Sequence, residues 1–255
     1  MTGTIINVVA ILLGGLLGCV LGGRLPERLR QTVMAGLGLF TLAIGLQLFL
    51  GTQNSLVVLG SLLIGTLLGE WWQVEDGIRR FGGWLEQRIY SRQGKGADEQ
   101  SSMEKEQRQS NRERFIRGFF TASLLFCIGP IAILGAIQDG LAGDYQLLAV
   151  KSVLDGFASL AFASSMGVGV LFSALPILVY QGGVSLLAAQ IEPLVSEAMM
   201  NEMSATGGVI LMAIAVSSLL EIKPIRSGNL LPALFVAPLL VALLTFLGVN
   251  WASLP

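Results

Sequence analysis

Long apolar runs alternate with short polar segments along most of the chain. Six runs of 17 to 20 residues contain no charged side chain, and they cover residues 5–23, 32–50, 51–69, 118–137, 204–220 and 230–249. The first of them is interrupted only by Asn7. An apolar α-helix of about 20 residues crosses the hydrocarbon core of a bilayer, which is ~30 Å thick. Each run therefore predicts a membrane-spanning helix.

A longer uncharged stretch of 36 residues covers positions 156–191. It is too long for one crossing and slightly short for two crossings with a turn. Glycines at positions 167 and 169 mark the expected turn, so the helix before it must begin near Leu147. That start places Lys151 and Asp155 inside the membrane. The count becomes about eight transmembrane helices in an all-α integral membrane protein.

Basic residues test this count. Fifteen of the 16 Lys and Arg residues fall in the connections after spans one, three and seven, and only Lys151 lies elsewhere. Cytoplasmic loops of membrane proteins carry an excess of Lys and Arg. We therefore expect residues 73–117 to be cytoplasmic and both termini to lie outside, in a single polytopic domain over residues 1–255.

The segment between spans three and four has a different composition. Residues 73–92 place aromatic and aliphatic side chains at helical spacing among charged ones, which predicts an amphipathic helix in the membrane interface. Residues 93–114 contain Met103 as their one large aliphatic side chain before the next span, which is typical of a flexible cytoplasmic linker. A peptide-binding or regulatory role for this linker is the alternative.

Composition excludes several classes of protein. Only 13% of the residues are charged, about half of what a soluble domain carries. The chain has no histidine, and its two cysteines, Cys19 and Cys127, lie in apolar runs, so we expect no metal site, no disulfide and no cofactor. A net charge of −1 predicts no nucleic-acid partner.

The first three spans and the last three share a weak pattern. A glycine pair, a proline-containing connection and a small-residue helix start recur in the same order, at residues 14–15, 25–29 and 35–38 and again at residues 182–183, 192–194 and 205–208. Span one would correspond to span six, an offset of five crossings. Because this number is odd, the two halves would have opposite orientations in the membrane. An inverted repeat of this kind is common in secondary transporters, although a duplicated scaffold would show it too.

Two prolines predict interrupted helices. Gly129-Pro130 falls midway through span four, where proline removes a backbone hydrogen bond and frees carbonyl groups near Phe126. Pro176 lies midway through span six and predicts a second interruption. A plain structural kink and a break that faces an ion or solute are both compatible with this pattern.

Lys151 and Asp155 are the charged pair within a span. They are four residues apart, so they share one helix face and can pair. Charged side chains within a membrane usually face the bundle interior or an aqueous path. Asp155 is therefore the first candidate ligand for an ion, and a permanently neutralised structural pair is the alternative.

Four further polar residues complete the candidate ion- or solute-binding set, and each lies at a helix end or interruption: Gln138, Asp139, Gln181 and Asn229. Their bland interpretation is that they cap helices or turns.

The stretch FCIGPIAILGAIQDGLAGD at residues 126–144, with the long run at 151–183 and SGNLLPAL at 227–234, resembles the YqgA/YdfK-like family of bacterial membrane proteins. The opening INVVAILLGGLLGCVLG fits the same family. The resemblance implies a multi-span protein of the bacterial inner membrane, and it supplies no catalytic residues.

The sequence leaves two classes of function open and argues against a third. Interrupted spans and intramembrane charge favour a transporter or channel for an ion or small solute. In this interpretation Asp155 binds a monovalent cation. A membrane scaffold or signalling partner, including a homodimer, is the alternative. An enzyme is not expected, because a Ser–His pair cannot form and Asp139 and Asp155 lack the Gly-x-Gly-Asp setting of an intramembrane aspartyl protease.

Overall fold

The computed structural model describes residues 1–23, 26–90 and 102–249, and every regular element among them is helical. The main helices are α1 (Thr2–Gly22), α2 (Glu27–Phe49), α3 (Ser55–Trp72), α4 (Val74–Tyr90), α5 (Ser102–Cys127), α6 (Pro130–Ala142), α7 (Gln146–Met166), α8 (Ala174–Leu186), α9 (Ala188–Ile191), α10 (Glu197–Ile214) and α11 (Ala233–Phe246). Short 3₁₀ segments are η1 (Gly167–Ser173), η2 (Glu192–Leu194) and η4 (Ser227–Leu230), and η3 (Ala215–Leu219) is a π-helix. The predicted all-α fold is confirmed.

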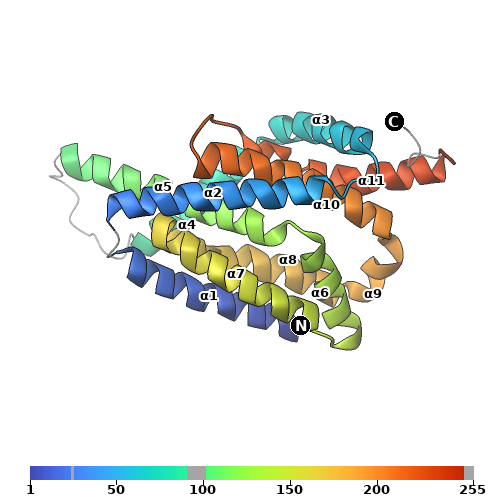
Figure 1. Ribbon diagram of the computed structural model, residues 1–255, viewed down its shortest axis with the longest axis horizontal. Coiled ribbons are helices and arrows are strands. Elements are labelled where there is room, and N and C mark those ends of the chain that lie inside the picture. Colours follow the sequence, from blue (N-terminus) through green and yellow to red (C-terminus); the bar gives the residue numbers. More distant parts are fainter. Residues whose placement is uncertain (24–25, 91–101, 250–255) are drawn as a thin grey trace.

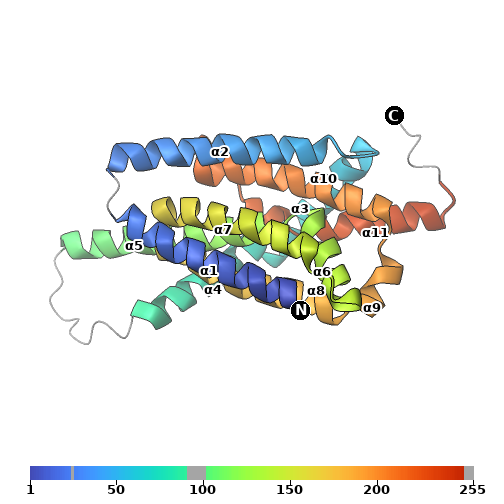
Figure 2. The ribbon, with the colours of Figure 1, turned by 60° about the horizontal axis from the view of Figure 1, so that its bottom comes forward.

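The long helices run lengthwise in one elongated bundle (Figures 1 and 2). Large apolar side chains are exposed along its outer helices, as Leu39, Leu67 and Phe235 show with exposed fractions of 61–73%. Apolar surface of this extent is typical of contact with lipid. The chain is therefore an integral membrane protein, as the sequence predicts.

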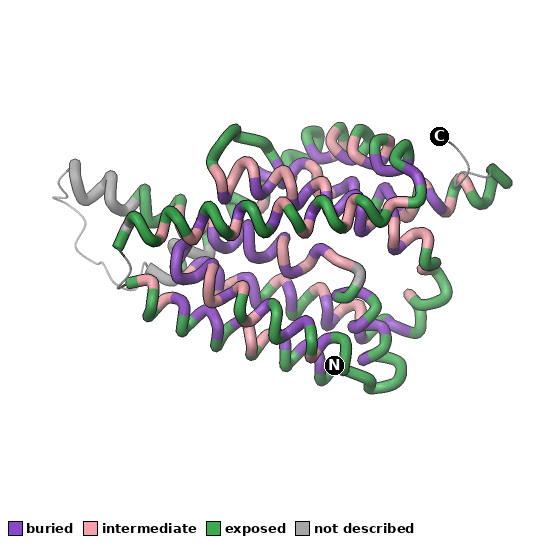
Figure 3. The backbone as a smooth tube through the Cα atoms, in the orientation of Figure 1, coloured by how far each residue is buried: buried purple, intermediate pink, exposed green. Residues whose placement is uncertain are grey.

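Burial separates an outer layer of helices from an inner one (Figure 3). In the apolar windows of α1, α2, α3 and α11, 22–33% of residues are buried, against 56% for the α7–α8 segment and 61% for α10. Polar side chains such as Asp155 on α7, Gln181 on α8 and Glu202 on α10 lie in the protein interior, away from lipid.

The chain reverses direction at Gly167, between α7 and the η1–α8 arm (Figure 1). Gly167 has φ +80°, in the left-handed region that favours glycine. Helix α1 connects the two arms, because its Asn7 donates hydrogen bonds both to Asp155 on α7 and to Gln181 on α8.

By length and hydropathy the described residues give six candidate spans, or seven when the bent pair α5–α6 is counted as one. In that count the whole stretch Gln146–Leu186 is a single span. The predicted number of eight depends on counting its two arms separately, and it stays a prediction.

Helices α2 and α10 pack closely and in opposite directions. A Cβ atom on Gly45 would lie 2.6 Å from the carbonyl oxygen of Gly208, and a Cβ atom on Gly208 would lie 2.4 Å from that of Gly45. Gly38, further toward the start of α2, meets Leu219 and Leu220 beyond the end of α10, which fixes the antiparallel direction. This reciprocal contact suits an inverted repeat of spans one to three and six to eight, which itself stays a prediction.

Two sequence expectations are changed by the structure. Helix α5 begins at Ser102, so residues 102–114 of the predicted linker form helix. The predictions for residues 91–101 concern a part of the chain outside the described residues. Pro176 is the third residue of α8, in a first turn whose N–H groups need no intrahelical partner, and it does not break that helix. The interruption of this span is the 3₁₀ segment η1, before the proline.

Helix α4 matches the predicted amphipathic segment. It begins one residue after the predicted start at position 73, and its polar face carries Glu75, Asp76 and Arg79. Trp71, Trp72 and Trp84 are more than half exposed at this end of the bundle. Aromatic side chains of this kind gather at membrane–water interfaces.

Candidate functional site

A buried polar network lies where α1, α5, α7 and α8 meet. Lys151 and Asp155 are each only 7% exposed, and they form an ion pair on one face of α7. Asn7 and Gln181 are fully buried, and the Nδ2 amide of Asn7 donates to Asp155 Oδ2 at 3.0 Å and to Gln181 Oε1 at 3.1 Å. Four polar side chains from three helices are thus joined inside a membrane bundle.

Small residues allow this arrangement. A Cβ atom on Gly14 would lie 2.1 Å from the carbonyl oxygen of Gly156, and one on Gly18 would lie 2.3 Å from that of Leu160. Helix α1 therefore lies directly against α7 along its length, as small residues permit in membrane helices (Figure 2). This close contact brings Asn7 within hydrogen-bond reach of Asp155.

The helix break at Gly129-Pro130 supplies the main-chain part of the network. Gly129 has φ +134° and precedes Pro130 at the start of α6. The axes of α5 and α6 meet at an angle of 64° at this point. The freed carbonyl oxygen of Phe126 accepts a hydrogen bond from Lys151 Nζ at 2.9 Å. The Lys151 ammonium is thus held by a carbonyl oxygen and a carboxylate together.

Several buried polar atoms around this network have no hydrogen-bond partner in the described part of the chain. They include Asn7 Oδ1 and Gln181 Nε2, and one helical turn further along α1 and α8 they include Thr4 Oγ1 and Ser185 Oγ. A buried polar atom without a partner costs about 1–3 kcal/mol. Unpartnered polar atoms of this kind can bond to water or to a small polar ligand.

Asp139 lies near the amino terminus, next to these atoms. Its buried carboxylate accepts a hydrogen bond from Gly3 N at 3.0 Å and pairs with the Met1 amino group at 3.1 Å. Its second oxygen, Oδ1, has no partner among the described residues. Ser185 lies beside it, because a Cβ atom on Gly140 would touch the Ser185 carbonyl oxygen at 2.1 Å.

Two predicted residues lie away from the network. Gln138 is exposed on α6, next to Asp139. Asn229 lies near the opposite end of the bundle, where its Oδ1 accepts a hydrogen bond from Glu75 N at 2.8 Å and connects η4 to α4. Asn229, in η4, therefore lies apart from Asp155, and its candidate role in binding stays a prediction.

Asn7 belongs to the network but not to the candidate set predicted from the sequence. Asn7 is the only interruption in the apolar run at residues 5–23, and a lone polar residue in a membrane helix is itself a signal. Helix α1 alone did not show which neighbour its side chain would meet.

Another buried carboxylate has a structural explanation. Glu202 on α10 is fully buried and accepts hydrogen bonds from Thr52 Oγ1 at 2.7 Å, Gln53 N at 2.6 Å and Asn54 N at 3.1 Å. These bonds fix the α2–α3 connection just before α3 begins. All of its observed bonds are with that connection, whereas the neighbours of Asp155 retain polar atoms without partners.

Within residues 1–23, 26–90 and 102–249, no three Cys, Asp or Glu side chains come close enough to hold a metal ion together. The network instead offers amide, carboxylate and carbonyl oxygens around one lysine.

Comparison with known proteins supports the family indicated by the sequence motifs. A family model described as "Protein of unknown function (DUF554)" matches residues 2–242. An "Uncharacterized protein YqgA" of Escherichia coli (strain K12) is 34% identical, over 92% of this chain and 94% of its own length. An "Uncharacterized membrane protein YdfK" of Bacillus subtilis (strain 168) is 28% identical, over 98% of this chain and 100% of its own. No solved structure matches the chain. Since the match covers nearly the whole chain, this membrane protein belongs to the DUF554 family.

Proposed function

We propose that this protein is a transporter or channel for a small monovalent cation, with its site at the Lys151–Asp155 pair. One observation carries the proposal: a lysine ammonium buried within the bundle is bound by a helix-break carbonyl and a carboxylate. These are the oxygen donors that a hard cation prefers. The ammonium therefore stands where a transported cation would bind.

The surroundings of the pair supply further oxygens. Gln181 Oε1 and Asn7 Oδ1 belong to the same network, and the second of these has no partner there. A cation that displaced the Lys151 ammonium would meet the Asp155 carboxylate and the Phe126 carbonyl oxygen, with these amide oxygens in the same network. Helix breaks with freed carbonyls near the middle of a span recur in transporters, where they form ion sites.

We expect a cation to enter from the Met1 end, past polar groups of α1 and α8. Thr4 and Ser185 lie one turn from Asn7 and Gln181 along the same helices, and Asp139 accepts a hydrogen bond from Gly3, next to Thr4. The Asp139 carboxylate is paired with the Met1 amino group, so Asp155 is the carboxylate that would favour a cation over an anionic solute once Lys151 is displaced.

The proposal includes the orientation predicted by the basic residues, with both termini outside and the Arg-rich end in the cytoplasm of a bacterial inner membrane. A single cysteine at Ala97, with Cys19 and Cys127 replaced, is expected to resist impermeant thiol reagents in intact cells. A single cysteine at Asp144 is expected to react. The reverse labelling pattern would contradict the orientation.

Flux measurements in proteoliposomes test the proposed activity. We expect the wild-type protein to carry at least one of Li⁺, Na⁺, K⁺ and H⁺ down an imposed gradient, and Asp155→Asn to lower that flux at least about tenfold per folded molecule. Asp144→Asn makes the same chemical change at an exposed loop position and is expected to keep wild-type flux.

Lys151→Met separates a cation site from a permanent structural pair. Without the ammonium, Asp155 should bind an added cation, so the thermal stability of Lys151→Met should rise with that cation in detergent. The double variant Lys151→Met/Asp155→Asn should show no such response. If Lys151→Met is insensitive to all four cations and Asp155→Asn keeps full flux, the pair is structural and a scaffold role is favoured instead.

A further inference from the structure

Buried polar atoms without hydrogen-bond partners gather between α1, α6 and α8, on the Met1 side of the Lys151–Asp155 pair. The residues that carry them are at most 4% exposed, and hydrogen bonds of 3.0–3.1 Å join α1 to α6 and to α8 at this place. Unpaired buried atoms cost free energy, so a group of them indicates a bound polar partner. We call them the Met1-end cluster, and in the described part of the chain they are Thr4 Oγ1, Asn7 Oδ1, Asp139 Oδ1, Gln181 Nε2 and Ser185 Oγ.

The orientation of two amides shows which kind of partner fits this cluster. The Asp155 carboxylate accepts from Asn7 Nδ2, so the Asn7 amide turns its Oδ1 the other way. The same Nδ2 donates to Gln181 Oε1, which leaves Gln181 Nε2 as an N–H donor without an acceptor among the described residues. A fitting partner must therefore donate to Asn7 Oδ1 and accept from Gln181 Nε2. A metal cation can bind only the first of these atoms, whereas water can bind both.

Room for water lies beside Gly182 of α8, which is buried. Apart from its chain neighbours and the backbone of its own helix, only Met1 Cε would lie within 4 Å of a Cβ atom on Gly182, at 3.0 Å. Gln181 is its neighbour in sequence, and Ser185 lies one turn further along the same helix. Because the end of a flexible side chain bounds this space, a shift of Met1 makes room for a water molecule. The place then offers both polar partners and room, which a buried water requires.

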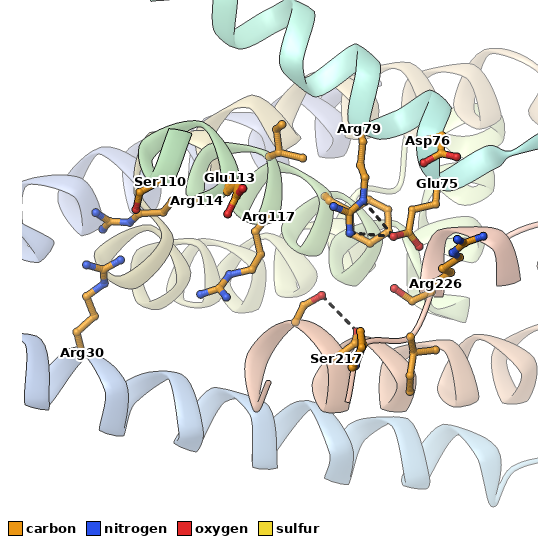
Figure 4. A pocket seen from close by; sticks show the side chains of 16 residues that line it. Arg30, Glu75, Asp76, Arg79, Ser110, Glu113, Arg114, Arg117, Ser217 and Arg226 are labelled. Carbon is orange, nitrogen blue, oxygen red and sulfur yellow. Dashed lines mark hydrogen bonds and ion pairs between the residues drawn. The ribbon is translucent and has the colours of Figure 1, made fainter. Parts of the chain in front are cut away.

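The Lys151–Asp155 pair lies between this cluster and an open cavity. Near the start of α7, Leu148 lies against Gly3, and in its last turn Ser165 accepts hydrogen bonds from arginines of α2 and α5. Both arginines line a cavity of about 870 Å³ between α2, α4, α5 and the end of α10 (Figure 4). Its wall holds five arginines and three acidic residues, so it is polar and accessible to water. Along α7, Asp155 thus has the Met1-end cluster on one side and this cavity on the other.

The titratable groups packed around the pair leave Asp155 as its proton acceptor. Cys127 of α5 interacts electrostatically with Lys151 and Asp155, and Tyr180 of α8 interacts with Cys127. A thiol and a phenol are ordinarily neutral at pH 7. Asp139 of α6 already pairs with the Met1 amino group at 3.1 Å. Asp155 is therefore the carboxylate beside Lys151 whose charge a proton would cancel.

We infer that water bound at the Met1-end cluster carries protons to and from Asp155, so that the transported cation is the proton. This inference rests on the proposed transport function. Each water gains a proton from one neighbour and gives one to the next, and an O–H bond forms at Asp155. The Lys151 ammonium stays on the Phe126 carbonyl oxygen, so the centre gains one positive charge, as with any bound monovalent cation. Acidic side chains buried within a membrane bundle serve as proton relays in pumps and transporters.

Proton flux in proteoliposomes tests the inference. The vesicles enclose a pH-sensitive dye, a pH gradient drives the flux, and valinomycin with equal K⁺ on both sides clamps the membrane potential. We expect the wild-type protein to carry protons, and Gly182→Ala to lower this flux about tenfold per folded molecule, because its methyl group fills the space for water. Gly183→Ala adds the same methyl group at the next position, where no such atom lies within 4 Å, and it is expected to keep wild-type flux.

A second variant guards against overpacking. Ser185→Ala removes one oxygen and adds no atom, and it is expected to lower proton flux about fivefold. Ser173→Ala is the matched control, because the buried Ser173 hydroxyl already donates to the Val170 carbonyl oxygen, and it should keep wild-type flux. Flux of Li⁺, Na⁺ or K⁺ without proton flux would overturn the inference but leave the transport proposal standing, whereas no flux at all would overturn both. Wild-type proton flux in both Gly182→Ala and Ser185→Ala would also overturn the inference.

Discussion

The centre of the bundle and its arginine-lined end hold charge in opposite ways. At the centre, Lys151 and Asp155 are 7% exposed and neutralise each other within a network of amides. At the end, five arginines and three acidic residues surround a cavity of about 870 Å³. The first region is closed and close to neutral, whereas the second is open and positive.

This difference predicts how much stability each region loses when one of its ion pairs is removed. In a low-dielectric interior, removing one member of an ion pair leaves a charge that neither water nor lipid can solvate. At an open end, water and salt replace a lost partner at little cost. Substitutions should therefore lower stability more at the centre than at the end.

The largest expected effect comes from breaking the central pair. Asp155→Asn should lower the free energy of unfolding by about 3–5 kcal/mol, because it leaves the Lys151 ammonium buried without its counter-charge. The double variant Lys151→Met/Asp155→Asn should recover most of that loss. Unfolding by sodium dodecyl sulfate in mixed micelles measures both, and equal losses in single and double variants would contradict a coupled pair.

A smaller effect is expected from the packing that closes the centre. Gly14→Ala should lower the free energy of unfolding by about 1–3 kcal/mol, since its Cβ atom would lie 2.1 Å from Gly156 O and push α1 away from α7. Gly36→Ala is the matched control on α2, where no heavy atom lies within 4 Å of the new Cβ atom. We expect it to be neutral or to stabilise by up to about 1 kcal/mol. Similar losses in the two variants would show that helix contact is not the cause.

The smallest effect is expected at the open end. Arg226 and Glu70 form an ion pair at 3.2 Å with side chains 72% and 47% exposed. A double-mutant cycle with Arg226→Gln and Glu70→Gln should give a coupling energy of about 0.2–1 kcal/mol that falls as salt is added. The Lys151–Asp155 coupling should be larger, and only a salt whose cation binds at the pair should weaken it. An equal weakening by all salts would mean that the centre is open to water.

Local sequence pattern predicted much of this molecule. Apolar run lengths gave the helices, because crossing a bilayer sets a length that hydropathy reports directly. The four-residue spacing of Lys151 and Asp155 predicted their pairing, and proline chemistry predicted the break at Gly129-Pro130 with a freed carbonyl near Phe126. Each of these depends only on residues close together in the chain.

The tertiary structure alone decided which polar residues meet. Asn7 reaches Asp155 because small residues let α1 lie against α7, and Gln181 reaches Asn7 because the chain reverses at Gly167. Asn229 lies apart from them at the α4–η4 junction. Arg30 and Arg114, distant in sequence, both donate hydrogen bonds to the carbonyl oxygen of Ser165, because α2 and α5 both pack beside the end of α7. Hydropathy fixes that a helix spans the membrane but not its rotation or neighbours, which follow from close packing between segments far apart in the chain.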